Sequence, residues 1–419
     1  MTGVIRGGFE GLDACVHCGF CLQACPTFLA TGDESDSPRG RIELMRALER
    51  GDLEADDPAL AYHLDRCLGC RACEPVCPSG VRYGRGLEAA RARIASVRGV
   101  PLLTRLALWA LTAPGVSGVV YWFARLLRSV LPRGIAGWGR VRFAMGMLAA
   151  TKAANGGERR RKAATAVAPA ALRRPAPPSA ALLFRGCVQQ GLFSHVHDAT
   201  VRTLGVNGYE TREVIGQGCC GALHAHAGLL DEARALARIN IAAFGDGAEP
   251  PPIVVNSAGC GALMKEYGHL VGGAESERFA ARVRDVTELL APAPVPGAPL
   301  DLHVAYDPPC HLLHAQGIAV PPLKLFAAIP LLELVQVPGA AECCGSAGLF
   351  TLVEPEMSRA VLAPKLARLR EAAPQVVATG NPGCLMQLGA GLAAAGLPTA
   401  VRHPVELLDD SYRAAGRYE

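Results

Sequence analysis

All sixteen cysteines of this 419-residue chain fall into four groups, and this grouping restricts its fold more than any other feature. Two groups share the spacing C-x2-C-x2-C-x3-C-P, and the other two are sparser. Cysteines used only for packing would be scattered among aliphatic positions, so the grouping indicates metal ligation. The first run is Cys15, Cys18, Cys21 and Cys25, the second is Cys67, Cys70, Cys73 and Cys77, and the sparse sets are Cys187, Cys219, Cys220 and Cys260, then Cys310, Cys343, Cys344 and Cys384.

Disulfides and zinc are the alternative uses of these cysteines. Disulfide frameworks are typical of short secreted chains, whereas this chain is long, half of its residues are hydrophobic, and its opening MTGVIRGGFEGLDAC lacks the apolar stretch of a signal peptide. Zinc usually takes two C-x2-C pairs without a third cysteine at the same interval. We therefore favour neither disulfides nor zinc for these cysteines, and we expect the protein in a reducing, cytoplasmic compartment.

The two dense runs have the spacing by which bacterial ferredoxins hold [4Fe-4S] clusters. Three cysteines at intervals of three can wrap three corners of a cubane, and the fourth, before the proline, ligates the other cluster in two-cluster ferredoxins. The expected ligand sets are therefore crossed: Cys15, Cys18 and Cys21 with Cys77, and Cys67, Cys70 and Cys73 with Cys25.

The region around these runs, residues 1–97, is predicted to be a small helical module and not a β-rich ferredoxin. Ser37 followed by Pro38 is the signature of a helix start, with serine as N-cap and proline at the first helical position. The stretch PALAYHLDR at 58–66 predicts a second helix that leads into the second run.

The sparse cysteines reveal an internal repeat. Cys187 and Cys310 are 123 positions apart, and the other three pairs are each 124 apart. Short apolar runs end at these cysteines, and stretches with helical periodicity follow Cys220 and Cys344. The pattern predicts two α/β domains, at 180–300 and 301–419, with at least partly parallel sheets and cysteines on loops at one sheet edge. For these eight cysteines, iron-sulfur ligation, a thiol role and a structural role all remain open.

The segment between the cysteine regions is basic and apolar. Residues 82–174 contain eighteen lysines and arginines against Glu88 and Glu158, which leaves the rest of the chain acidic. Leu106 to Ala124 lacks any charge and approaches the length of a membrane span, but Pro114-Gly115 within it predicts two shorter amphipathic helices. We expect a helical connector at 98–155 and a flexible linker at 156–179.

The connector has three possible neighbours: the chain's own domains, a partner subunit or an anionic membrane surface. No nucleic-acid-binding module accompanies its basic residues, so nucleic acid is not expected as a partner. No nucleotide or flavin fingerprint was found anywhere in the chain. His224, His226, His311 and His314 lie near the sparse cysteines, where a structural role is favoured over proton transfer or metal binding.

Several short motifs are spread over nearly the whole chain: DACVHCGFC at 13–21, SPRGRI at 37–42, CPSGVRY at 77–83, GCCGA at 218–222, SAGCGA at 257–262 with KEYG at 265–268, HAQ at 314–316 and CCGSAG at 343–348. Together they resemble the family of glycolate oxidase iron-sulfur subunits. The wider group to which that family belongs includes heterodisulfide reductases and joins a two-cluster module to two cysteine-rich CCG domains. The resemblance thus implies an α+β multidomain protein.

The resemblance also implies a function. It suggests the non-flavin subunit of an oxidase that converts glycolate to glyoxylate, with FAD and the substrate site on partner subunits and electrons passing to a quinone-type acceptor. The position would be cytoplasmic, with peripheral contact at the inner face of the membrane as a further expectation.

One departure from the wider group bears on the alternative functions. Full CCG motifs of heterodisulfide reductase end in C-x2-C, but here Leu263 and Gln387 occupy the places of the last cysteine. This puts disulfide-reducing chemistry in doubt. A heterodisulfide-reductase-like subunit, or a lactate or glycerol-3-phosphate dehydrogenase subunit, with a redox-catalytic CCG cluster is the alternative function, and an iron-sulfur-stabilised scaffold is a third.

Overall fold

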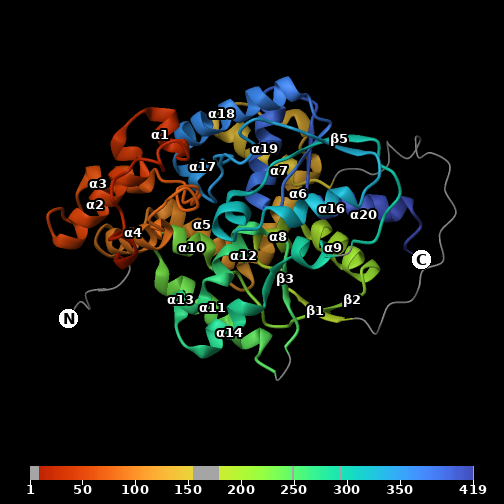
Figure 1. Ribbon diagram of the computed structural model, residues 1–419, viewed down its shortest axis with the longest axis horizontal. Coiled ribbons are helices and arrows are strands. Elements are labelled where there is room, and N and C mark those ends of the chain that lie inside the picture. The colour runs from red at the N-terminus through yellow and green to blue at the C-terminus, as the bar shows by residue number, and fades with distance from the viewer. Residues whose placement is uncertain (1–8, 154–178, 248–249, 293, 419) are drawn as a thin grey trace.

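The computed structural model describes residues 9–153, 179–247, 250–292 and 294–418. It divides into an N-terminal helical module, a helical connector and two α/β units, as the sequence predicted in outline (Figure 1). The predicted linker lies outside the described residues, apart from Ser179, which begins the first strand. The boundaries between the domains stay a prediction.

The N-terminal module contains no strand among its described residues, which agrees with the predicted helical character. Ser37 caps α2 as expected, because its Oγ accepts a hydrogen bond of 3.0 Å from the backbone N–H of Gly40. Leu12, Met45, Leu64 and other apolar side chains fill a core of its own. The helices are α1 (Pro26–Thr31), α2 (Pro38–Arg50), α3 (Pro58–Asp65) and α4 (Tyr83–Arg98), with short 3-10 turns at Glu10–Leu12 and Glu34–Asp36.

The connector forms three helices: α5 (Leu102–Thr112), α6 (Val116–Val130) and α7 (Arg140–Ala150), with a 3-10 turn at Arg133–Ile135. The predicted break at Pro114-Gly115 is confirmed, since Gly115 precedes α6 with a φ of 78°. Among the described residues, no single helix combines the length and apolar character needed to cross a bilayer. One bent pair, α4 with α5, meets those criteria together across a bend of 113°.

Each α/β unit has a four-stranded sheet whose strand pairs are all parallel. The strand orders, β2-β1-β3-β4 and β6-β5-β7-β8, correspond position by position, which confirms the repeat. The strands are β1 (Ser179–Leu183), β2 (Tyr209–Glu213), β3 (Ile253–Val255), β4 (Val283–Asp285), β5 (Leu302–Tyr306), β6 (Leu332–Val335), β7 (Val376–Ala378) and β8 (Ala400–Arg402).

Helices connect these strands and cover the sheet centres, where every residue of β3 and β7 is buried, as is typical of parallel sheets. The first unit has α8 (Val188–Leu192), α9 (Ser194–Val206), α10 (Ala222–His226), α11 (Leu230–Phe244), α12 (Ala258–Lys265), α13 (Tyr267–Val271), α14 (Ala274–Arg282) and α15 (Val286–Leu290). The second has a π-helical turn (His311–Ala315), α16 (Val320–Ala327), α17 (Phe350–Val353), α18 (Pro355–Ala372), α19 (Pro382–Ala394) and α20 (Pro404–Ala414).

The two units share a hydrophobic core, in which Phe193 and Val254 of the first pack in one cluster with Val304 and Tyr412 of the second. Polar contacts join them near the strand ends: the Gly259 N–H donates to Asn381 Oδ1 at 3.1 Å, and Gln316 Nε2 donates to the Ala258 carbonyl at 3.0 Å. The HAQ motif therefore serves to join the repeats.

The N-terminal module lies at one end of the molecule, against both units (Figure 1). Arg71 and Arg85 of the module both pair with Glu266 of the first unit, at 2.6 and 3.4 Å. The Arg91 guanidinium donates to the His226 carbonyl at 3.1 Å. Gly228 fits against the backbone of Arg91 so closely that an added Cβ would lie 2.5 Å from the Arg91 carbonyl oxygen.

Gly228 allows a direct test of this docking. Gly228 and Gly272 have similar positive φ values, 79° and 77°, but a Cβ on Gly272 would meet nothing within 4 Å. Alanine at either site should cost about 1–2 kcal/mol in backbone strain, and at Gly228 about 1–3 kcal/mol more because it presses on α4. Thermal unfolding of Gly228→Ala and Gly272→Ala followed by circular dichroism measures the difference; equal losses would contradict the close contact.

Glu88 on α4 makes the stability of the folded protein at this junction depend on pH. Burial, with the nearby Glu266 carboxylate, raises the pKa of Glu88 to about 7 from a usual 4.5. A raised carboxyl pKa means that the folded state binds more protons, so its stability falls as pH rises from about 4.5 to about 7. About a quarter of the side chain is exposed, at 26%, which moderates the effect.

We therefore expect Glu88→Gln to be more stable than the natural protein at pH 8, by about 1–2 kcal/mol, and nearly unchanged at pH 5. The midpoints of unfolding at both pH values provide the measurement. Glu333→Gln, on an exposed strand residue, controls for the loss of one charge. A stability difference that is the same at both pH values would exclude this role for Glu88.

Candidate metal centres

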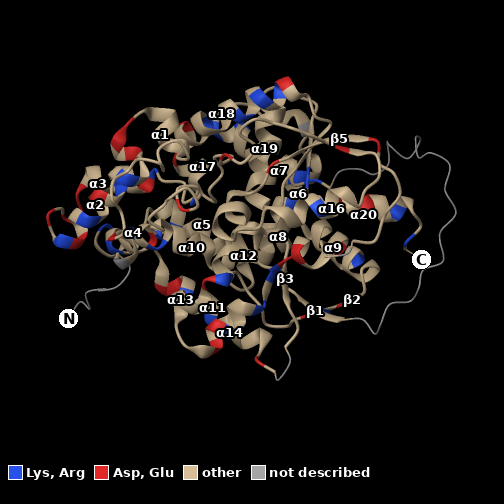
Figure 2. Ribbon diagram, in the orientation of Figure 1, with Lys and Arg blue, Asp and Glu red and all other residues tan. Residues whose placement is uncertain are grey.

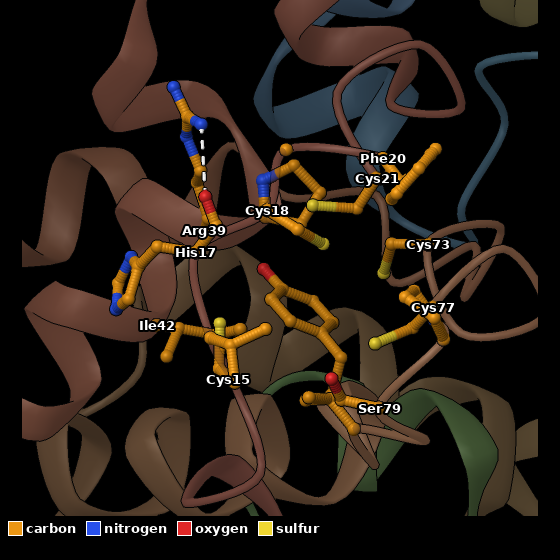
Figure 3. Close-up of a pocket in the computed structure, with 16 residues that line it drawn as sticks. Cys15, His17, Cys18, Phe20, Cys21, Arg39, Ile42, Cys73, Cys77 and Ser79 are labelled. Carbon is orange, nitrogen blue, oxygen red and sulfur yellow. Dashed lines mark hydrogen bonds between the residues drawn. The ribbon is translucent and has the colours of Figure 1, made fainter.

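Three cysteines of the first run and the last cysteine of the second run line one cavity of the N-terminal module, with an empty volume of about 420 Å³ (Figure 3). The loop after the 3-10 turn at Glu10–Leu12 carries the first three, and the segment before α4 carries the fourth. Val16 and Phe20, 69% and 67% exposed, border the cavity at the protein surface. The lining cysteines are Cys15, Cys18, Cys21 and Cys77, and Cys73 also contributes.

A second cavity, of about 300 Å³, lies deeper in the module. Its sulfur atoms belong to Cys25, Cys67, Cys70 and Cys73, all of which are buried. The fold thus brings together both of the crossed sets that the spacing predicts. Four thiols around each cavity suit a [4Fe-4S] cluster, which proteins hold by four cysteines.

The loops achieve this convergence by the same backbone device in both runs. The residue before and the residue after the second cysteine have positive φ: His17 (55°) and Gly19 (85°) in the first run, Gly69 (61°) and Arg71 (60°) in the second. Successive turns of this kind point backbone N–H groups inward, which favours an anion. One such N–H, that of Gly69, donates to the Cys67 sulfur at 3.5 Å.

Arg41 supplies positive charge to the deeper cavity. It lies within α2 with no exposed surface, donates to Thr27 Oγ1 at 2.8 Å, and pairs with the buried Asp36 carboxylate at 3.0 Å. Burial alone would raise the pKa of Cys67, but Arg41 and Arg91, with the Tyr83 hydroxyl 3.4 Å from the sulfur, hold that pKa below its usual value. The surroundings therefore favour thiolate, which is the form that ligates iron.

Asp36 also lies near Asp33 and His63, in an arrangement whose spacing would admit a metal ion. Arg41 and Arg66 both pair with the Asp36 carboxylate, each at 3.0 Å. The His63 ring lies 3.1 Å from the same carboxylate. The two guanidinium groups already balance the carboxylate charge, so this group is an ion-pair network that stabilises α2 and α3.

The four cysteines of the first α/β unit also converge. The sulfur of Cys187 lies 3.3 Å from that of Cys219, and the thiol of Cys220 lies beside those of Cys219 and Cys260. Cys187 follows β1, Cys219 and Cys220 follow β2, and Cys260 follows β3, so all four come after the carboxyl ends of strands, at the edge that the sequence analysis predicted. Tyr267, from the KEYG motif, donates to the Cys220 carbonyl at 2.8 Å and fixes the loop.

The second unit repeats this arrangement. Cys344 and Cys384 have their sulfur atoms 3.2 Å apart, and Cys343 contacts both Cys310 and Cys344. All sixteen cysteines of the chain are free of disulfides. The structure thus assembles eight thiols in two compact groups, but their ligation of a metal remains a prediction.

The two repeats have different residues at the position where the full CCG motif, described above, has its last cysteine. Leu263 is buried in the apolar core of the first unit. Gln387 is buried in the second unit, where its Oε1 accepts from Thr351 at 3.0 Å and its Nε2 donates to Ser358 at 2.9 Å. Both positions are filled by side chains that have structural partners.

The two thiol groups have different neighbours. Tyr121 of α6 is buried against the first: burial, followed by the closeness of Cys187, Cys219 and Cys260, raises its pKa above the usual value. The second group borders the N-terminal module, because Cys343 packs in one apolar cluster with Cys70. The deeper cavity of the module therefore adjoins the second unit directly.

The histidines near the sparse cysteines have mainly structural contacts. His314 Nε2 lies 3.2 Å from the Ala341 carbonyl, and the rings of His226 and His311 pack with centroids 5.4 Å apart. His311 Nδ1 lies 3.4 Å from the Cys310 sulfur. Burial lowers the pKa of His224, as it does for the other three.

Sequence reasoning missed several residues that shape these centres. Arg41 belongs to the SPRGRI motif and Tyr83 to CPSGVRY, so the motifs marked them without indicating that they surround the second cavity. Tyr121 carried no such signal, because its role depends on how α6 packs across the first unit.

Comparisons with known proteins agree with this geometry. The model of the 4Fe-4S dicluster domain matches residues 11–81. The model of the cysteine-rich domain, CCG, matches twice, at 181–265 and 304–389. The two matched CCG segments lie within the two repeats, and the dicluster match contains both crossed cysteine sets, which supports iron-sulfur clusters as cofactors.

Curated relatives extend over nearly the whole chain. It is 34% identical to the probable glycolate oxidase iron-sulfur subunit of Bacillus subtilis, over 96% of this chain and 94% of that protein. It is 33% identical to the glycolate oxidase iron-sulfur subunit of Escherichia coli, with the same coverage. Lactate utilization protein A of Geobacillus kaustophilus is 30% identical over 54% of this chain. The chain therefore belongs to the family of glycolate oxidase iron-sulfur subunits.

Proposed function

We propose that this protein is the iron-sulfur electron-transfer subunit of a flavin-dependent glycolate oxidase complex. The observation that carries the proposal is the assembly of two complete sets of four thiols around separate cavities of the N-terminal module. The names of the relatives that match 96% of the chain support the substrate.

In this proposal each crossed set holds one [4Fe-4S] cluster. When bound, such clusters accept and donate single electrons. The chain's own residues hold them and set their surroundings: Arg41 places positive charge beside Cys25 and Cys67, while Leu68 and Tyr83 help to keep water from the deeper set. The eight cysteines of the CCG units are candidates for further iron-sulfur ligation.

Oxidation of glycolate to glyoxylate releases two electrons and two protons. We propose that FAD on a partner subunit accepts them at the substrate site, and that this chain conducts the electrons singly to a quinone, which becomes a quinol by taking up two electrons and two protons. A quinone acceptor places the protein peripherally at the inner face of the cell membrane.

The surface cavity is the expected entry point for electrons. Cys18 is exposed there, and the neighbouring Val16 and Phe20 present an apolar rim on which a flavin subunit could pack. Arg39, which also lines the cavity, donates to the His17 carbonyl at 3.3 Å and so supports the rim (Figure 3). In this proposal, electrons would then pass inward to the deeper set of cysteines, which lies next to Cys343.

A catalytic reductase acting at a CCG centre is the rival function, and the convergence of four thiols in each unit favours considering it. In that case electrons would be consumed by chemistry at a CCG thiol group. Substitution of Cys219 and Cys220 to serine separates the proposals, because a relay that uses only the N-terminal module would keep its rate and a catalytic site there would lose it.

Substitutions at the fourth cysteines test the crossed ligation. Cys77→Ser should remove the cluster at the surface cavity, and Cys25→Ser the one at the deeper cavity, each with a loss of about four iron atoms per chain. In both variants glycolate should still reduce the partner's flavin, while electron delivery to the acceptor falls by at least about a hundredfold because the relay is interrupted.

Iron and sulfide analysis, EPR of the reduced protein and flavin absorbance in the assembled complex measure these outcomes. If Cys77→Ser instead abolished the signal that depends on Cys67, Cys70 and Cys73, the ligand sets would be uncrossed. Undiminished delivery in both variants would contradict the relay.

A further inference from the structure

The outer face of α5 and α6 is apolar and exposed. Of the twenty-six large hydrophobic side chains that are exposed among the described residues, twelve lie between Leu102 and Val141. On α6 they recur at intervals of three and four residues, which places them on one helical face. They are Val119, Trp122, Phe123, Leu126, Leu127 and Val130 on α6, and Leu102, Leu103, Leu106 and Trp109 on α5; together these ten residues are called the outer face below.

The opposite sides of these helices are buried in the protein. Leu108 of α5 and Tyr121 of α6 are almost fully covered. A Cβ on Gly191 of α8 would lie only 2.3 Å from the Tyr121 ring, and Arg128 Nη1 donates to the Leu192 carbonyl at 2.8 Å. These contacts hold α6 on the first unit, and its apolar stripe therefore faces away from that unit.

The charges around the outer face have one sign. No acidic residue occurs between Glu88 and Glu158, and none of the charged residues on α5 to α7 is acidic (Figure 2). The exposed arginines include Arg105, Arg125, Arg140 and Arg142. An apolar stripe with tryptophans, bordered by arginines, matches the headgroup region of an anionic bilayer, where apolar side chains enter and guanidinium groups meet phosphates.

The length of the helices decides how they would meet the bilayer. Neither α5 nor α6 can span it, and the break at Gly115 keeps them separate. Helices of this kind lie in the plane of the interface with one face immersed. α5 and α6 pack against each other, so their exposed apolar residues lie on neighbouring helices.

We propose that the outer face docks in the headgroup region of an anionic lipid bilayer, so that α6 lies between the thiols of the first CCG unit and the membrane surface. The docking itself stands apart from the proposed electron transfer. Only its purpose, to bring the protein to a lipid-soluble acceptor, rests on the proposed function.

Vesicle binding by the full-length, cluster-loaded protein tests the docking. The protein should sediment with vesicles of equal parts phosphatidylglycerol and phosphatidylcholine, less with phosphatidylcholine alone, and less at high salt, with a blue shift of tryptophan fluorescence. Trp122→Glu with Phe123→Glu should weaken binding by at least roughly a hundredfold, because two aromatic side chains that enter the bilayer are lost. Arg105→Gln with Arg125→Gln should weaken binding to the anionic vesicles by roughly tenfold to thirtyfold.

Ile215→Glu is the matched control, since Ile215 is 93% exposed but lies outside the outer face, and its binding should be unchanged. Iron content and circular dichroism confirm that each variant is folded and loaded. Absence of binding by the natural protein, or equal binding by the Trp122 and Phe123 variant, overturns the proposal. The proposal is also overturned if that variant still binds vesicles but, by light scattering, no longer self-associates or no longer forms the complex with the flavin subunit.

The two proposals fail in different ways. If Cys25→Ser with Cys77→Ser binds vesicles normally but does not pass electrons, the docking is supported independently of the relay. If the Trp122 and Phe123 variant passes electrons to a water-soluble dye at the natural rate but loses vesicle binding, the docking is supported and the relay is intact. Normal vesicle binding by that variant counts against the docking whatever its electron transfer.

Discussion

Each thiol group in this protein must be assembled from segments that are far apart in the sequence, and the rest of the structure depends on that requirement. The crossed sets of the N-terminal module bring together cysteines that lie 42 or more residues apart in the sequence. In the α/β units, parallel strands deliver cysteines to one sheet edge because their carboxyl ends coincide there. Burial of so many sulfur atoms then calls for positive groups nearby, and Arg41 is the clearest example.

Regular patterns in the sequence were sufficient for much of the fold. Ser37 and Pro38 marked the start of α2, Pro114 and Gly115 marked the break between α5 and α6, and the apolar runs before the sparse cysteines marked the central strands. The signals are local in each case: a cap, a helix breaker or a short hydrophobic run.

What could not be predicted depends on contacts between distant segments. The strands β2 and β6 lie at sheet edges and are partly exposed, and YETRE in β2 lacks the apolar character that marks β1 and β3. The packing of Tyr121 over the first CCG thiols and the pairing of Glu266 with Arg71 join parts of the chain that have no local signal in common. Duplication explains why the CCG units share a topology, but their surroundings arise only in the assembled molecule.

The loops of the two cysteine runs also make the two sides of the N-terminal module different. Each loop needs positive φ on both sides of its second cysteine, and each uses glycine at one of these places and a larger residue at the other, in opposite order. In the first run the larger residue is His17, which pairs with Glu43 near the surface; in the second it is Arg71, which reaches Glu266 of the first α/β unit. Two loops of matching backbone therefore have unlike roles, one as an outward face and one as an anchor. Exchanging their order would leave the backbone geometry of both runs possible, yet it would remove the ion pair between Arg71 and Glu266 that anchors the module to the first α/β unit.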